Sequence, residues 1–231
     1  MKKTLLSALM AAVLWPATVF SAPLDAITKV WTYDHANTGV AGLTSEIVAF
    51  DKLTNTLWVA GVKGVDVLNA KTGQLIKHID TSIYGAINSV AIHNGVAAFA
   101  IESTVDRTQS GTIRLFNTTT MTPAAGINSI TVGALPDMIK FTADGSRLLV
   151  ANEATPTVYG VPALDPQGSV SVIDMGTRTV LHTATFNAAP TSGSHIRTGT
   201  GMDFEPEYIA VNAAGTRAYV TLQEANAIGV L

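Results

Sequence analysis

The segment DMIKFTADGSRLLVANE, residues 137–153, decides the fold. It consists of a short β-rich run, a turn at Asp144-Gly145 and a second β-rich run. Asp-Gly and Asn-Gly are strong hairpin signals, because a type I′ turn requires a positive φ at both central residues. The segment therefore predicts an antiparallel β-hairpin.

The same pattern occurs in three other places along the chain. These segments are EIVAFDKLTNTLWVAG from Glu46, NSVAIHNGVAAFAIE from Asn88 and EYIAVNAAGTRAYVTLQE from Glu207. A third β-rich run follows every hairpin, and a fourth run follows the first three hairpins. Equivalent positions are Phe50, Ile92, Phe141 and Val211, and the first two intervals match the roughly 40–50 residues of a propeller blade. The sequence predicts an all-β propeller of four-stranded blades, similar to YVTN and WD40 repeats.

The repeat is incomplete, with about three and a half blades present. The fourth unit stops at Leu231, inside its third expected strand. Propellers close with roughly four to eight blades, and an open apolar edge is normally avoided. We therefore expect an N-terminal part of a longer protein that lacks its remaining blades; the alternative is that two copies close one ring. The stretch ITKVWTY, residues 27–33, could supply a strand to a closing blade.

The N-terminal segment has the pattern of an export signal. Residues 1–21 comprise two lysines, an apolar stretch of about a dozen residues and small residues near Ser21 and Ala22. The apolar stretch is too short to cross a bilayer as a stable helix. We expect cleavage after Ser21, which leaves a partial propeller domain over residues 22–231 without a transmembrane span. The protein is then exported to the periplasm, the cell surface or the extracellular space.

Composition excludes several classes of function. The chain has no cysteine, which excludes disulfide scaffolds, Cys-ligated metal sites and thiol nucleophiles. It has 14 basic and 17 acidic residues and no basic run beyond Lys2-Lys3, so no nucleic-acid partner is expected. No G-x-S-x-G elbow is present to activate a serine, and no nucleophile–base pair stands out.

The carboxylates follow the repeat. Glu46, Asp137 and Glu207 share the first position of strand one, whereas Glu102, Glu153 and Glu224 share the last position of strand two. The start of one strand lies beside the end of the other in an antiparallel hairpin. Strand one lines the channel of a propeller, so we expect all six side chains at one mouth of that channel. Solvated strand ends are the simpler interpretation.

A cation would relieve the repulsion among these groups. Carboxylates at short range repel one another unless a cation, a shared proton or water intervenes. Oxygen ligands suit calcium or another hard divalent cation. Arg197, in a Gly/Ser/Thr-rich loop before the fourth hairpin, is a possible contact for an anion.

Long stretches of the chain resemble the choice-of-anchor I family. They are SEIVAFD (45–51), INSVAIHNG (87–95), ALPDMIKFTADGSRLLVANE (134–153), DPQGSVSVIDM (165–175) and DFEPEYIAVNAAGTRAYVTLQEANAIGVL (203–231). The resemblance implies an extracellular or periplasmic β-propeller. It also implies a relation to mesenchyme-specific cell surface glycoproteins and to bacterial proteins with alkaline-phosphatase-like names. It implies no catalytic residues.

Three functions remain open at this stage. The first is a calcium-binding module that interacts with an unknown extracellular ligand or matrix component. The second is a metal-dependent phosphoesterase, which uses the channel-mouth carboxylates to hold cations that bind a phosphate ester and activate water. The third is a lactonase-like or redox propeller. Whether the protein is an enzyme is not decided by the sequence.

Overall fold

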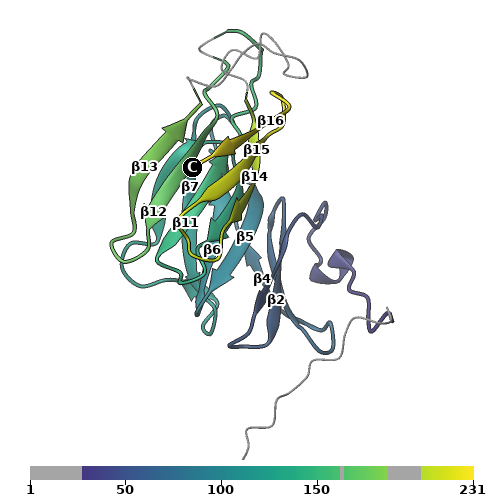
Figure 1. Ribbon diagram of the computed structural model, residues 1–231. Coiled ribbons are helices and arrows are strands. Elements are labelled where there is room, and N and C mark those ends of the chain that lie inside the picture. The colour runs from purple at the N-terminus through teal and green to yellow at the C-terminus, as the bar shows by residue number, and fades with distance from the viewer. Residues whose placement is uncertain (1–27, 162–163, 187–203) are drawn as a thin grey trace, which may run out of the picture. The chain divides into compact units, whose positions relative to one another are not determined.

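The computed structural model describes residues 28–161, 164–186 and 204–231 (Figure 1). The expected signal segment and the loop with Arg197 lie outside the described residues. Residues 1–30 form a unit of their own, so the description below concerns residues 31–231. No helix in the described ranges is long and apolar enough to cross a membrane. Their one short helix is the 3-10 helix η1 (His35–Thr38).

Four antiparallel sheets follow one another along the chain, and each has the strand order of a propeller blade. The first blade contains β1 (Val48–Asp51), β2 (Thr56–Gly61), β3 (Gly64–Asn69) and β4 (Leu75–Asp80). The second contains β5 (Ile87–His93), β6 (Val96–Ile101), β7 (Ser110–Asn117), the two-residue β8 (Thr122–Pro123) and β9 (Ser129–Ala134). Both β8 and β9 pair with β7.

The third blade contains β10 (Pro136–Phe141), β11 (Arg147–Asn152), β12 (Ser169–Asp174) and β13 (Thr179–Thr185). The fourth sheet has three strands, β14 (Pro206–Val211), β15 (Ala218–Leu222) and β16 (Ala227–Val230). The prediction of an all-β propeller of four-stranded blades is confirmed. The short β8 was not expected from the sequence.

Two local predictions are wrong. Residues 28–33, the described part of the stretch 27–33, form no strand. Among the four described hairpin turns, only Asn94-Gly95 has two positive φ angles, 43° and 85°, as a type I′ turn requires. At Asp144-Gly145 only the glycine has a positive φ, 71°. There the Asp144 side chain accepts hydrogen bonds from Thr142 and Ser146, which favours a longer turn.

Three apolar cores lie between successive blades. The side chains of a blade's second strand point alternately to its two faces, so this one strand contributes residues to two cores. On β6, Phe99 and Ile101 face the first blade, whereas Ala98 and Ala100 face the third. Successive side chains of a strand point to opposite faces of the sheet, so an all-apolar strand is buried on both faces. Trp58 of β2, fully buried, packs against Phe99 with a ring-centroid distance of 6.0 Å.

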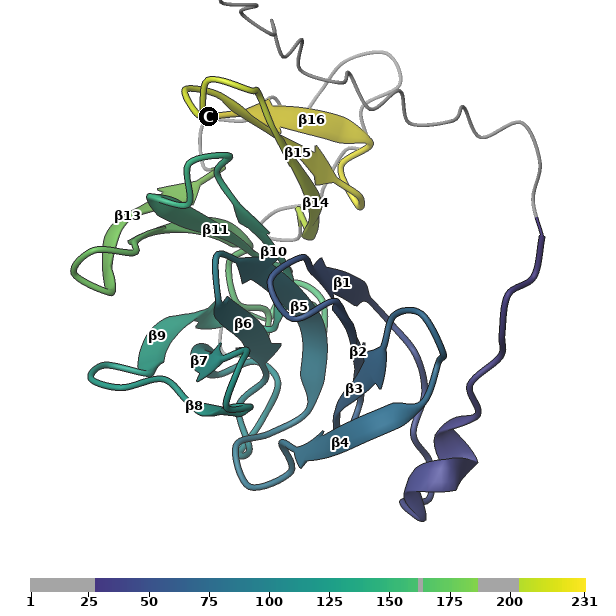
Figure 2. The same ribbon diagram turned by 90° about the horizontal axis from the view of Figure 1, so that it is seen from below.

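The same arrangement recurs one blade further on. On β11, Leu148 and Val150 face the second blade, whereas Leu149 and Ala151 face the fourth. This radial packing brings the first strands β1, β5, β10 and β14 together, as Figure 2 shows from below.

Candidate functional site

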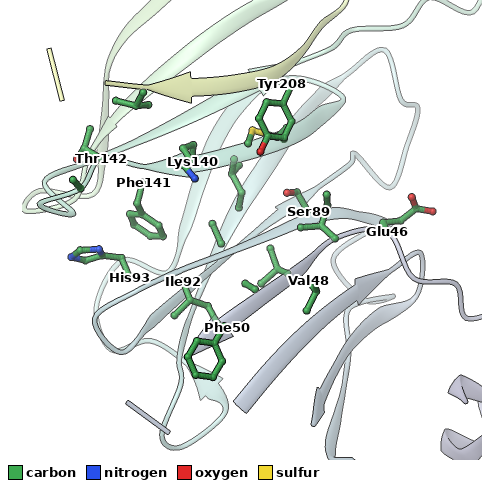
Figure 3. A pocket seen from close by; sticks show the side chains of 18 of the residues that line it. Glu46, Val48, Phe50, Ser89, Ile92, His93, Lys140, Phe141, Thr142 and Tyr208 are labelled. Atoms are coloured by element: carbon green, nitrogen blue, oxygen red, sulfur yellow. The ribbon is translucent and has the colours of Figure 1, made fainter. Parts of the chain in front are cut away.

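The four first strands line an open cavity of about 720 Å³. Its wall includes Val48 and Phe50 of β1, Ile92 of β5 and Tyr208 of β14, all contributed by first strands. In Figure 3, Glu46 lies at one end of the cavity, and His93 and Phe141 lie at the other end. The first strands therefore line a shared cavity where the channel was expected, and the end with the acidic residue is called the channel mouth below.

A repeated irregularity positions the side chains at that mouth. The ladder between the first and second strands shifts register between Ile87 and Ser89, between Pro136 and Met138, and between Pro206 and Ile209. The shifts therefore fall at Asn88, Asp137 and Glu207. A β-bulge leaves a residue unpaired and re-aims its side chain.

In the first blade, the equivalent residue lies just ahead of the regular ladder. Glu46 precedes β1, and its N–H donates to the carbonyl oxygen of Ala60 at 2.9 Å. The side chain of Asn88 donates to the carbonyl oxygen of Pro136 at 3.2 Å and so joins the second blade to the third. The predicted register of strand one, with Glu46, Asp137 and Glu207 equivalent, agrees with the hydrogen bonding.

The second acidic position follows the end of strand two in two blades. The N–H of Glu102 donates to the carbonyl oxygen of Ala86, and the N–H of Glu153 donates to that of Leu135, both at 2.8 Å. Each bond closes the hairpin at the channel mouth. Glu102 and Glu153 are therefore equivalent, as predicted.

The assignment of Glu224 to this position is wrong by one residue. In the fourth sheet it is Gln223 whose N–H donates to the equivalent carbonyl, that of Glu205, at 3.1 Å. Glu224 lies one residue further on, in the turn between β15 and β16. The spacing from strand one agrees with the ladder, because Gln223 lies 16 residues after Glu207 just as Glu153 lies 16 residues after Asp137. The fourth blade thus contributes an amide where the second and third contribute a carboxylate.

Four of the predicted carboxylates act electrostatically on a fifth, Asp137. Burial, which is the largest cause, and the charges of four neighbouring carboxylates together raise the pKa of Asp137 to about 7. Those neighbours are Glu153, Glu207, Glu46 and Glu102, in order of decreasing effect. The five residues come from all four sheets, so the tertiary structure assembles the group.

Glu153 is in a mixed environment. Burial raises its pKa, and the charges of Glu207 and Glu102 act in the same direction. The Thr155 hydroxyl donates to Glu153 Oε1, and the positive charge of Arg107 lies nearby; both lower the pKa. Sequence analysis missed Arg107, because it lies in an ordinary loop between β6 and β7 without a motif.

The arrangement does not form a ready coordination sphere. Within the described ranges, no group of three or more His, Asp or Glu side chains is placed to hold a metal ion. The donors at the mouth are oxygens from different blades, which suits a hard cation more than a transition metal. The channel mouth is an acidic region in which the carboxyl group of Asp137 has a pKa near neutrality.

Comparison with known proteins identifies the family of the chain. Residues 46–231 match the choice-of-anchor I domain. Such domains are typical of exported or cell-surface proteins. No curated protein matches the chain.

Two solved structures are similar to the chain. Hydrazine synthase from Kuenenia stuttgartiensis is 16% identical, with a TM-score of 0.50 over 80% of this chain. Dihydro-heme d1 dehydrogenase NirN in complex with DHE is 14% identical, with a TM-score of 0.49 over 75% of this chain. The chain spans 63% and 32% of the lengths of these two proteins. At this identity, the likeness to the first structure shows the fold alone.

Proposed function

Because the chain belongs to the choice-of-anchor I family, we propose that it is an exported or cell-surface β-propeller that binds calcium at its channel mouth and interacts there with an extracellular or matrix component. One observation carries this proposal: Asp137 is partly buried and lies within electrostatic range of four further carboxylates, and the five come from four sheets. They are Glu46, Glu102, Asp137, Glu153 and Glu207. A divalent cation with oxygen ligands is the simplest counter-charge for such a group.

The cation would also explain how an acidic mouth can hold a partner. Surface and matrix components commonly carry carboxylate, sulfate or phosphate groups, which the carboxylates alone repel. Calcium takes six to eight oxygen ligands, so ligands from a partner can complete a sphere begun by the protein. Because the side chains are not arranged around a point, binding requires rotamer changes at the mouth. Such changes favour an affinity in the weak range of extracellular calcium sites.

A metal-dependent phosphoesterase is the second candidate, and Arg107 favours it. This guanidinium lies near enough to Glu153 to lower the pKa of that carboxyl group. A cation held by carboxylates beside an arginine is an arrangement that can bind a phosphate ester and activate water. Hydrolysis of p-nitrophenyl phosphate that requires a divalent cation and falls in Arg107→Gln would support this candidate over a pure binding module.

Thermal unfolding of the full chain tests calcium binding. A ligand that binds only the folded state stabilises it by about 2.7 kcal/mol at a concentration 100 times its Kd. We expect the melting temperature to rise with calcium over EDTA, and this rise to be lost in Glu207→Gln. Asp80→Asn, at the exposed end of outer strand β4, should keep the full rise. The proposal would be overturned if calcium left the melting temperature of the wild type unchanged. It would also be overturned if calcium raised the melting temperatures of Glu207→Gln and Asp80→Asn equally.

A further inference from the structure

A serine, a histidine and an aspartate lie in a hydrogen-bonded row away from the channel. The ring of His35 contacts the Ser45 hydroxyl through Nε2 and Asp66 Oδ2 through Nδ1, the latter at 2.5 Å. Asp66 is 2% exposed and belongs to β3, whereas Ser45 is exposed just ahead of β1. The row therefore runs from a buried carboxylate to a hydroxyl at the surface.

The direction of the hydrogen bonds in the row follows from the Asp66 carboxylate at its buried end. A carboxylate only accepts hydrogen bonds, so the Nδ1 atom of His35 must carry the ring proton. In the neutral ring, Nε2 then has a lone pair, and the Ser45 hydroxyl is its donor. This tautomer is the one in which an imidazole can remove a proton from a serine hydroxyl.

Asp66 is held in place by two further donors. His78 contacts its Oδ1 atom through Nδ1 at 2.6 Å, and the Tyr33 hydroxyl donates to Oδ2 at 3.2 Å. Burial, the charge of Asp66 and the hydrogen bond to it together raise the pKa of Tyr33 to about 12, so the phenol is a donor at neutral pH. The carboxylate has a fixed orientation toward His35 as a result.

His35 also borders an open cavity of about 570 Å³. The loop that forms it runs through residues 32–36 and 39–43, and its apolar side chains include Val40 and Leu43. The Lys63 ammonium group donates to the carbonyl oxygen of Ala41 at 2.7 Å and anchors this loop to the first blade. A small ligand with an apolar end can thus lie beside the imidazole.

We propose that Ser45, His35 and Asp66 form a nucleophilic hydrolase site for small carboxylic esters with an apolar acyl group. Ser45 Oγ would attack the ester carbonyl carbon while its proton passes to His35 Nε2. The C–O bond to the alcohol then breaks, and the alcohol leaves with that proton. Water, activated by the same imidazole, hydrolyses the acyl-serine, releases the acid and restores the Ser45 hydroxyl. The site needs no metal, and because Ser45 directly precedes Glu46 of the channel mouth, its assays are carried out in EDTA.

Covalent labelling of the full chain by a fluorophosphonate probe tests the site. In EDTA, we expect mass spectrometry to find the phosphonylated residue at Ser45. The labelling rate should fall by about 10²-fold or more in His35→Gln, because a general base contributes roughly 10²–10⁴-fold. His182→Gln, on an exposed part of β13, and Ser110→Ala, at the exposed start of β7, are matched controls that should leave the rate unchanged.

The alternative is that the row only fastens the segment ahead of β1 to the first blade. In that case His35→Gln would lower the melting temperature, but Ser45 would label no faster than Ser110. Absence of label at Ser45 in the folded wild type, or an equal rate in a folded His35→Gln variant, would overturn the proposal. Release of p-nitrophenol from p-nitrophenyl butyrate in EDTA, lost in Ser45→Ala, would support it by a second readout. This assay is separate from the calcium response, so one proposal can fail without the other.

Discussion

Replacing Asp137 by asparagine should stabilise the calcium-free protein at alkaline pH and have little effect in acid. Burial and four neighbouring glutamates raise the pKa of Asp137 from 3.8 to about 7. The folded state therefore binds this proton more tightly than the unfolded state. Stability linked to it is fully present below pH 3.8 and is lost as the pH rises through about 7.

The magnitude follows from the shift. About three pKa units correspond to about 4 kcal/mol in full, and solvent screening of a half-buried carboxyl group reduces this to about 2 kcal/mol. In EDTA at pH 8, Asp137→Asn should raise the melting temperature by about 4–8 °C, at about 2–4 °C per kcal/mol for a chain of this size. At pH 4 the two proteins should melt within about 1–2 °C of each other.

A second carboxylate provides a control of opposite sign. Hydrogen bonds from Thr142 and Ser146 lower the pKa of Asp144 to about 2. Its contribution to stability is present above pH 3.8 and is lost as the pH falls through about 2. Asp144→Asn should therefore destabilise the protein at pH 8. Equal melting of wild type and Asp137→Asn at pH 8, or a destabilised variant, would refute the convergence of charge at the channel mouth.

Two further predictions concern packing. Trp58→Ala should lower the free energy of unfolding, measured by urea titration, by about 3–5 kcal/mol, because the fully buried indole fills the core between the first two blades. The control variant Ile83→Ala, at an exposed position, should change it by less than about 1 kcal/mol. Gly145→Ala should cost about 1–3 kcal/mol more than Gly160→Ala. Both glycines have positive φ, 71° and 74°, but a Cβ at Gly145 would lie 2.1 Å from the His93 ring, and one at Gly160 meets nothing within 4 Å. Equal costs in the two glycine variants would contradict the close contact at His93.

Sequence alone determined the blades and one acidic register. Hairpin order and the alternation of apolar residues depend on neighbours within about ten residues, so the repeat predicted the strands of all four sheets except the two-residue β8. Glu46, Asp137 and Glu207 could be equated because the repeat has the same length from these residues to Phe50, Phe141 and Val211.

Tertiary structure decided the environment of each acidic group. The bulges at Asp137 and Glu207 are visible only in the ladder, and the hydrogen bond from the Gln223 N–H to the Glu205 carbonyl oxygen places Gln223 rather than Glu224 at the second acidic position. Arg107 reaches Glu153 from a loop on the neighbouring blade, and no periodicity marks that loop. The raised pKa of Asp137 needs burial together with charges from four sheets, and an alignment contains neither.

The row of Ser45, His35 and Asp66 is the clearest case of information that only the folded chain contains. His35 lies 10 residues from Ser45 and 31 from Asp66, spacings that match no catalytic motif. The three meet because Asp66 lies buried on the inner strand β3, and the segment ahead of β1 packs against it through Tyr33 and His35. Local sequence determines which strands and turns form. Hydrogen bonds between side chains far apart in the chain depend on how those strands and turns pack in the tertiary structure.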